Sequence, residues 1–337
     1  MSLRLATFNL ESLGHEGPEG PSLAARIEAL RPMLQRLRAD VLCLQEVNAE
    51  RRRKGAAREL AALDALLAET PYARWPRVST TRPGGDGPMD VHNLVIVSRW
   101  EIAESRQLHH DLVAPPDYRP VTAEPAADAA AAVTWDRPVL YARIGLGGGV
   151  DLHLVNLHLK APLAVAIPGA KAGPFAWKSA AAWAEGFFLA GLKRTGQALE
   201  ARFLIDQLFD AEPRALVAVL GDFNAEAHEV PVRIISAAED DTGSGELAGR
   251  ALVALERSLP TSQRYSVMHH GAPQMLDHVL VSRSLMAHYR GAEIHNEALE
   301  DELVGYHGIE RSPDSFHAPM VVDFDLPQAP PATEAKE

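Results

Sequence analysis

The sequence predicts an α/β fold in which two sheets pack face to face and helices flank them. Three observations favour this fold. Apolar runs of about five to eight residues recur along the chain with polar residues at one end, which is typical of buried strands. Stretches rich in alanine, leucine and charged residues are typical of helices. Between residues 94 and 157 several strands follow one another without a helix, which favours a sandwich over a purely parallel sheet.

These patterns assign the elements in chain order. We expect strands at residues 4–9, 41–45, 94–98, 139–144, 152–157, 216–220, 278–282 and 320–324. We expect helices at residues 22–38, 56–67, 177–193 and 197–209. Residues 115–132, heavy in alanine and proline, look loose, and the proline-rich tail 327–337 is expected to be disordered because it cannot bury enough apolar surface.

The composition indicates an ordinary globular protein. Its 337 residues are 47% hydrophobic and 23% charged, so one sizeable domain over residues 1–326 is expected. Cys43 is the only cysteine and lies in an apolar run, which excludes an intramolecular disulfide and a thiolate metal cluster. The first residues, Met1–Leu5, lead into a strand without a long apolar stretch, so we expect no secretion signal, no membrane span and a cytoplasmic location.

The charge of the chain disfavours one class of partner. There are 33 lysines and arginines against 45 aspartates and glutamates, a formal net charge of −12. This balance repels polyanions and argues against a surface that coats nucleic acid non-specifically. A bound divalent metal would reverse the field inside a local cleft, so the net charge does not exclude an anionic substrate. No feature of the sequence predicts a protein partner.

Polar side chains recur at one kind of position, the end of a buried strand, where a sheet holds them rigidly beside a cleft. Alone, each has an ordinary structural explanation, such as a helix cap, a turn or a satisfied core histidine. The shared position weakens that explanation. The segments are Phe8-Asn9, Gln45-Glu46, Asn156-Leu157-His158, Gly221-Asp222-Phe223-Asn224 and Asp277-His278-Val279, and a sixth, Ser315-Phe316-His317, precedes the last strand.

In this order the segments resemble the endonuclease/exonuclease/phosphatase superfamily. Its members carry an Asn on the first strand, a Q-E pair on the second, then N-x-H, G-D-x-N, D-x-[IV] and a late S-D-H. The resemblance spans residues 9–317. It implies a DNase I-like, four-layer α/β/β/α sandwich of two mixed sheets, and a metal-dependent phosphoesterase. His92-Asn93 and Arg137-Pro138 also fall where the family has motif segments, but their contacts are weaker inferences.

The resemblance places a metal at Glu46 with Asn9 beside it. Hard oxygen ligands of this kind suit Mg²⁺ or Mn²⁺. One position departs from the family pattern, since Phe316 stands where an acidic residue usually precedes the histidine. Asp314 could substitute only if the loop is rearranged, so the number of metals, one or two, is left open.

The resemblance also assigns the catalytic side chains. His317 would accept a proton from the attacking water or orient it, with Asp277 holding its other ring nitrogen. Asp222 would position or deprotonate the nucleophile or assist the leaving oxygen. Asn224 and His158 would contact the phosphoryl oxygens, where charge builds up in the transition state.

The sequence leaves the substrate open. A soluble phosphodiester or phosphomonoester is favoured by the acidic balance, and nucleic acid is kept as an alternative. A rival from another class is a non-catalytic binding module that keeps the fold and the cleft, with Phe316 as its first sign of decay. Residues 161–196, which include Trp183 and Phe187, suggest a lid insertion or an interfacial helix, and packing against the protein is the favoured interpretation.

Overall fold

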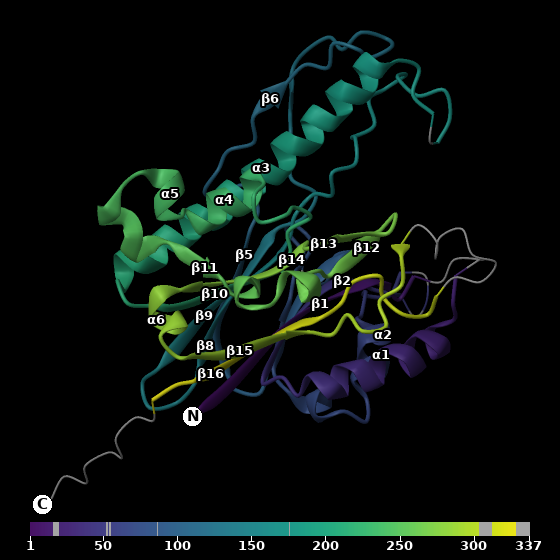
Figure 1. The fold of residues 1–337 in the computed structure, drawn as a ribbon. Helices are drawn as coiled ribbons and strands as arrows, with labels where there is room; N and C mark the ends of the chain where they lie inside the picture. Colours follow the sequence, from purple (N-terminus) through teal and green to yellow (C-terminus); the bar gives the residue numbers. More distant parts are fainter. Residues whose placement is uncertain are drawn as a thin grey trace, which may run out of the picture.

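The protein is a sandwich of two mixed sheets covered by helices on both outer faces (Figure 1). The computed structural model describes residues 1–15, 20–51, 53, 55–85, 87–174, 176–302 and 312–327. Helices α1 (Leu23–Leu37) and α2 (Ala61–Leu67) cover the first sheet, and α3 (Ala180–Ala211) with α4 (Val230–Ser236) covers the second. The predicted four-layer α/β/β/α architecture is confirmed.

Each sheet has six strands in the described part of the chain. The first has the order β15 (Tyr289–Ile294), β16 (Met320–Asp325), β1 (Ser2–Leu13), β2 (Val41–Val47), β4 (Asn93–Ser98) and β3 (Arg77–Ser79). The second has the order β11 (Leu252–Ala254), β14 (Asp277–Ser282), β10 (Leu216–Asp222), β9 (Asp151–His158), β8 (Val139–Gly145) and β5 (Ile102–Leu108). Only β1 with β2 and β9 with β10 pair in parallel, so both sheets are mixed.

The remaining elements are short. Two small ribbons pair β6 (Asp117–Tyr118) with β7 (Ala131–Ala132) and β12 (Val267–His269) with β13 (Ala272–Gln274). Single α-turns are α5 (Glu239–Thr242) and α6 (Arg283–Met286), and 3-10 turns are η1 (Pro71–Arg74), η2 (Gly245–Arg250), η3 (Leu255–Ser258) and η4 (Thr261–Gln263).

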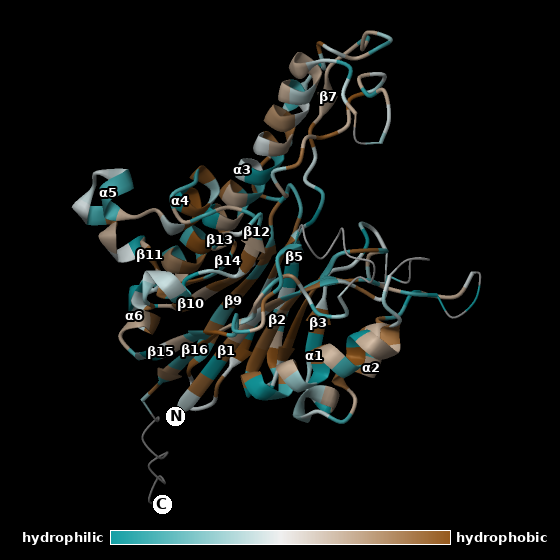
Figure 2. Cartoon of the chain, turned by 45° about the vertical axis from the view of Figure 1, so that its right-hand side comes forward, coloured by the Kyte–Doolittle hydropathy of each residue, from teal (hydrophilic) through white to brown (hydrophobic). Residues whose placement is uncertain are grey.

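Alternation along the strands produces three apolar layers. Successive residues of a strand face opposite sides, so Leu3 and Leu5 point between the sheets while Ala6 and Phe8 point toward α1 and α2. On the second sheet, Leu154 faces the interior and Val155 faces α3. The central strands, such as β4 and β10, are accordingly mostly hydrophobic, whereas the edge strands β5 and β15 carry exposed polar residues, and Figure 2 shows both brown and teal on the sheets. This explains why continuous apolar runs identified the strands.

All eight predicted strands are present, and the first predicted helix is α1, but the helix predicted at 56–67 is shorter. It begins only at Ala61. The backbones of Glu50 and Glu59 exchange two hydrogen bonds of 2.9 Å, which holds the chain extended up to that point. A long-range pairing thus overrides the local helical preference.

The helices predicted at 177–193 and 197–209 form the single 32-residue helix α3. It begins after Ser179, whose side chain accepts a hydrogen bond from the amide of Ala182, as a helix cap does. Gly196 does not break it. A Cβ atom at Gly196 would lie 2.3 Å from the ring of Trp135, so this glycine permits close packing of the indole on the helix.

The first half of α3 projects beyond the sheets (Figure 1). We call residues 116–133 and 163–192 the arm. Its two loops pack on α3 through a small apolar cluster that includes Val133, Ile167 and Leu189. Residues 115–132, expected to be loose, are ordered there because Glu185 accepts hydrogen bonds from the amide and hydroxyl of Thr122 and from Tyr118 Oη.

Packing against the protein, the interpretation favoured for residues 161–196, is only partly right. On the outer face of the arm, Trp183, Phe187 and Phe188 are 46%, 41% and 49% exposed. Trp183 and Phe187 stack on each other with ring centroids 5.3 Å apart. No helix among the described residues is long and apolar enough to cross a membrane. The domain boundary at 326 and the lid stay predictions, and most of the tail 327–337 lies outside the described residues.

Candidate active site

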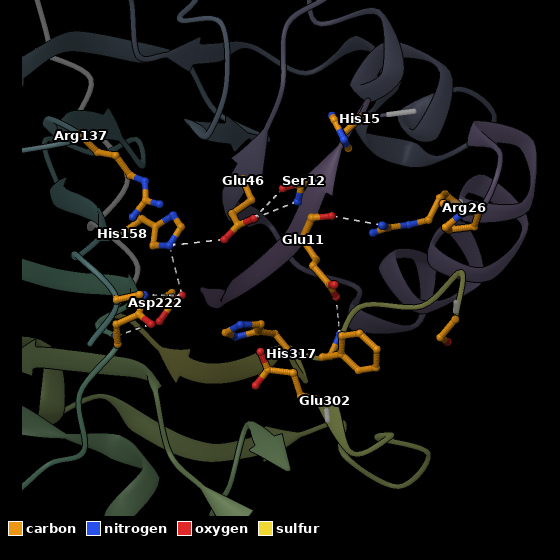
Figure 3. A pocket seen from close by; sticks show the side chains of 16 residues that line it. Glu11, Ser12, His15, Arg26, Glu46, Arg137, His158, Asp222, Glu302 and His317 are labelled. Carbon is orange, nitrogen blue, oxygen red and sulfur yellow. Dashed lines mark hydrogen bonds and ion pairs between the residues drawn. The ribbon is translucent and has the colours of Figure 1, made fainter. Parts of the chain in front are cut away.

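The predicted site residues meet where strands of both sheets end. Asp222 is the last residue of β10, and the strand register places it beside His158 of β9 and Asp277 of β14. From the first sheet, Asn9 on β1 lies beside Gln45 on β2, and Glu46 follows directly. Figure 3 shows Glu46, His158, Asp222 and His317 around one pocket.

The G-D-F-N segment has a local steric reason for its glycine. Gly221 has a φ of 142°, and a Cβ atom there would lie 2.0 Å from the carbonyl oxygen of Leu157 on β9. Only glycine allows this close approach of the two backbones. The glycine therefore sets the position of Asp222 at the end of the sheet.

Asn9 connects the two sheets at the site. Its side-chain nitrogen donates to Asp222 Oδ2 at 3.0 Å and to Glu46 Oε1 at 3.4 Å, while its oxygen accepts from the amide of Glu11. Deeper in the sandwich, Gln45 donates to Asn156 Oδ1 at 2.7 Å across the two sheets. Gln45, from the Q-E pair, and Asn156, from N-x-H, thus form a buried hydrogen bond that joins the two sheets.

His317 and Asp277 form a hydrogen-bonded pair. His317 Nδ1 lies 2.7 Å from Asp277 Oδ2, and the amide of His317 donates to Ser315 Oγ at 3.1 Å. Ser315 Oγ in turn donates to the backbone oxygen of Asn9, which ties the late segment to β1. Burial alone would lower the pKa of His317, but the carboxylates of Asp277 and Asp222 raise it to about 10.

Asp222 is surrounded by donors. Its Oδ1 accepts from the amide of Asn224 at 2.8 Å, and its Oδ2 accepts from the side chains of Asn224 and Asn9, both at 3.0 Å. Burial raises the pKa of Asp222 to about 7, with Asp277 acting in the same direction and His317 against it. A carboxyl group with this pKa is able to exchange a proton near neutral pH.

Glu46 and His158 face each other across the pocket. His158 Nε2 lies 3.5 Å from Glu46 Oε1 and 3.3 Å from Asp222 Oδ2, and Glu46 Oε2 accepts from the amide of Ser12 at 2.9 Å. Burial, together with Arg137, lowers the pKa of His158 well below its usual value, so the ring is neutral. Burial alone would raise the pKa of Glu46, but the contact with His92 and the charge of Arg137 hold it well below its usual value.

Sequence reasoning missed Glu11. This side chain lines the pocket, and its Oε2 accepts a hydrogen bond of 2.9 Å from the amide of Phe316, the residue that departs from the family pattern. Asp314, the substitute considered from the sequence, is not among the residues that line the pocket. Glu11 lies two residues after Asn9, but its positive φ of 45° breaks the regular alternation of the strand, so the sequence pattern did not indicate it.

Arg137, only weakly indicated by its motif, is a half-buried cation in the pocket wall. Its Nη1 donates to the backbone oxygen of Leu159 at 3.3 Å, and its buried Nε has no hydrogen-bond partner among the described residues. The pocket has a volume of about 310 Å³. Its described lining is Glu11, Ser12, His15, Gly20, Pro21, Arg26, Glu46, Arg137, His158, Ala161, Asp222, Asn224, Glu302, Ser312, Phe316 and His317.

Strained backbone gathers at this site. Ten described non-glycine residues have a positive φ, and half of them surround the site: Glu11, Ser12, Glu46, His92 and Asn224. Such conformations cost free energy and persist only where the surrounding structure imposes them, which is typical of ligand sites. Asn9, Glu46, His158, Asp222, Asn224, Asp277 and His317, the seven predicted site residues, are all brought together here.

The four-layer sandwich with an acidic and imidazole-lined pocket at its strand ends defines a class of metal-dependent phosphoesterases. The chain belongs to the endonuclease/exonuclease/phosphatase family, whose sequence model matches residues 6–301. Members of this family hydrolyse phosphoester bonds. A search of curated proteins finds no match.

Solved structures share the fold over nearly the whole chain. Truncated TDP2 from Caenorhabditis elegans is 15% identical, with a TM-score of 0.55 over 96% of this chain and 98% of that one. The 3′ phosphatase NExo from Neisseria, bound to a product DNA hairpin, is 17% identical, with a TM-score of 0.52 over 96% and 100%. An AP endonuclease from Archaeoglobus fulgidus is 16% identical, with a TM-score of 0.50 over 96% and 100%.

Proposed function

We propose that this protein is a divalent-metal-dependent hydrolase that cleaves a phosphoester by attack of water. The observation that carries the proposal is the convergence of Glu46, Asp222 and the Asp277–His317 pair on one pocket from both sheets. An acidic ligand for a cation, an ionisable carboxyl group and an oriented imidazole are the groups that this chemistry requires.

The residues present fit a divalent ion. Glu46 offers an anionic oxygen, Glu11 lies in the same pocket wall, and the buried Nδ1 of His92, which faces Glu46, has no hydrogen-bond partner among the described residues. We propose that Glu46 holds Mg²⁺ or Mn²⁺, which when bound would polarise the phosphoryl oxygens and lower the pKa of a bound water. Asn9 directs its side-chain nitrogen at Glu46 and Asp222, so we give it a positioning role.

The Asp277–His317 pair supports proton transfer. Because Asp277 engages Nδ1 of His317, the ring is held in one orientation and its other nitrogen is left for water or a phosphoryl oxygen. Asp222 lies next to this pair, with one carboxylate oxygen within 4.8 Å of ligand atoms of Asp277 and His317, and its oxygens are fixed by Asn9 and Asn224. We propose that Asp222 and His317 share the handling of the proton between the nucleophile and the leaving oxygen.

The cationic side of the pocket supports binding of an anion. Arg137 is half-buried, and its buried Nε is unpaired within the described chain, which is costly unless an anionic ligand is present. Asn224 and Arg137 both donate to the backbone oxygen of Leu159, whereas His158, expected to contact the phosphoryl oxygens, directs its Nε2 at Glu46 and Asp222. We propose that Arg137 and Asn224 bind the phosphoryl oxygens, where guanidinium and amide donors match the developing charge.

The pocket supports a small phosphodiester or phosphomonoester as substrate. Its volume of about 310 Å³ is at the lower end of the range for small-molecule sites. The net charge of −12 disfavours long polyanions. Nucleic acid remains the second candidate, since the similar structure from Neisseria holds a DNA hairpin as its product.

The test is hydrolysis of bis-p-nitrophenyl phosphate, p-nitrophenyl phosphate and plasmid DNA with Mg²⁺, Mn²⁺ or EDTA. Wild type is compared with His317→Ala and with His270→Ala, a matched control at an exposed histidine that does not line the pocket. Metal-dependent cleavage that only His317→Ala loses is expected. No cleavage of any substrate by folded, metal-binding protein would favour the binding module instead.

A further inference from the structure

Three side chains that bind metals elsewhere in proteins converge at the edge of the pocket. Glu46 lies between two imidazoles: His92 Nδ1 is 3.5 Å from its Oε2, and His158 Nε2 is 3.5 Å from its Oε1. One ligand atom from each of the three lies within 4.8 Å of the other two. Around an ion with bonds of about 2.0–2.2 Å, tetrahedral ligand atoms lie about 3.3–3.6 Å apart. Each imidazole nitrogen lies at about that distance from one carboxylate oxygen of Glu46, so small side-chain movements would bring all three ligand atoms around one ion.

The ring of His92 has a buried nitrogen that no group of the described protein satisfies. Its Nδ1 is buried and has no hydrogen-bond partner in the described part of the chain. Its ring packs edge to face on His158, with centroids 6.1 Å apart. A buried ring nitrogen without a partner, directed at a carboxylate too distant for a good hydrogen bond, has the arrangement of an unfilled metal ligand.

The backbone fixes this arrangement at a cost. His92 has a φ of 55° and Glu46 a φ of 58°, both in the left-handed region that non-glycine residues rarely adopt. The amide of His92 donates to Asn48 Oδ1 at 2.9 Å, and the side chain of Asn93 donates to the backbone oxygens of Val47 and Met89. These bonds pin the start of β4 to the end of β2, so the strained conformation is imposed.

We infer that Glu46, His92 and His158 form a mixed carboxylate and imidazole site for a first-row transition-metal ion, of the class Mn²⁺, Co²⁺ or Zn²⁺, in preference to Mg²⁺. Imidazole nitrogen suits transition metals, whereas Mg²⁺ strongly prefers oxygen ligands. The inference rests on the proposed function for the use of the ion in hydrolysis, but the site itself is defined by these three side chains.

The test is a titration of the purified protein with Co²⁺, followed by its visible absorption bands, which report nitrogen ligation. Wild type is compared with His92→Asn, because asparagine tolerates a left-handed backbone and lacks the imidazole. His270→Asn is the matched control, since His270 also has a positive φ, of 52°, and does not line the pocket. His92→Gly serves if His92→Asn fails to fold.

We expect His92→Asn to weaken Co²⁺ binding by at least the roughly 10- to 100-fold that loss of a supporting ligand contact costs. His270→Asn should match wild type, and millimolar Mg²⁺ should not displace Co²⁺. An unchanged titration in His92→Asn, ready displacement by Mg²⁺, or the absence of Co²⁺ bands in wild type would each overturn the site.

Parallel assays with bis-p-nitrophenyl phosphate separate this inference from the proposed function. Hydrolysis by wild type with Mg²⁺, combined with Co²⁺ binding that does not depend on His92, overturns the site and leaves the phosphoesterase in place. Tight binding that depends on His92, without hydrolysis under any metal, supports the site and removes the proposed function.

Discussion

The two sheets contribute different kinds of groups to the pocket. The first-sheet half is Glu46, His92 and His317, and the second-sheet half is His158, Asp222 and Asp277. Side chains in the first-sheet half are 16–32% exposed, whereas those in the second-sheet half are only 1–2% exposed. The first-sheet half is thus more open to ligands, whereas His158 and Asp222 reach the pocket from nearly buried positions and Asp277 orients His317.

The two halves of the pocket also differ in backbone conformation, which is regular in the second-sheet half and strained in the first-sheet half. His158, Asp222 and Asp277 end or begin regular strands that pair with one another, so ordinary sheet geometry places them. Glu46 and His92 lie in left-handed conformations at irregular strand ends. We therefore expect changes in the first-sheet half to alter function with little effect on stability, and changes in the buried second sheet to alter stability.

Glu46→Gln is expected to have the largest effect and tests the first-sheet half most directly. Metal-dependent hydrolysis should fall to background, a loss of roughly 10⁴-fold or more, because Lewis-acid stabilisation is worth several kcal/mol. The melting temperature without metal should change little. Activity retained at saturating Mg²⁺ or Mn²⁺ would remove Glu46 from the metal site, and Glu212→Gln, at an exposed position, is the control.

His317→Ala is expected to lower kcat by roughly 10²–10⁴-fold, the usual contribution of a proton-transferring side chain. Metal binding measured by titration should persist, because Glu46 and His92 are untouched. Steady-state kinetics on the best substrate give kcat and KM separately. A modest loss confined to KM would contradict the role in proton transfer.

His278→Gln tests the second sheet through stability. His278 Nδ1 lies 2.6 Å from Glu256 Oε1 and its Nε2 2.8 Å from the backbone oxygen of Ala225, so both ring nitrogens face acceptors. Burial alone would lower the pKa of His278, but the facing Glu256 raises it above its usual value. Breaking this buried pair should cost about 3–5 kcal/mol of unfolding free energy.

The same pair predicts a pH dependence. Because the folded pKa of His278 is raised, its stabilisation is complete below about pH 6.5 and is lost as the pH rises through the folded pKa. Urea unfolding between pH 6 and pH 9 should show this loss in wild type and a flatter profile in His278→Gln. An equal slope in the two proteins would show that another group is responsible, and His228→Gln, at an exposed histidine, is the control.

Phe316→Asp is expected to have the smallest effect. The new carboxylate would lie beside Glu11, and one more unit charge at about 4 Å adds about 2 kcal/mol of attraction for a divalent cation in a wet pocket. The metal concentration for half-maximal activity should fall by roughly 30-fold. An unchanged metal titration would mean that Glu11 already compensates for the missing acidic residue.

The regular strands of the two sheets were predicted correctly from the sequence. The strands were predictable because apolar runs buried on both faces are short and continuous. The candidate site residues lie together because most of them end those strands, while their roles stay predictions. Gln45 and Asn156 belong to the predicted motifs, yet their role as a link between the sheets could not be read from the pattern. Such a role depends on which strands face each other, and spacing along the chain does not contain that information.

The features that the sequence did not predict depend on unusual backbone conformation or on residues that are remote in the sequence. Glu11 was overlooked because the strand pattern gives no sign that the backbone reverses to a positive φ there. The order of residues 115–132 comes from Glu185, a helical residue more than fifty positions away in the sequence. The two helices predicted at 177–193 and 197–209 are continuous through Gly196, which packs on the equally remote Trp135.

Helix α3 couples the arm mechanically to the pocket. Its 32 residues form a rod about 48 Å long, stiff over its whole length. Near its middle, Arg194 Nη1 donates to the backbone oxygen of Asn224 at 2.7 Å, while its outer turns carry the aromatic side chains of the arm. A force on the outer end of the helix would therefore be transmitted through Arg194 to the backbone of Asn224. Faster hydrogen exchange of the Asn224 amide in Arg194→Gln would reveal this linkage.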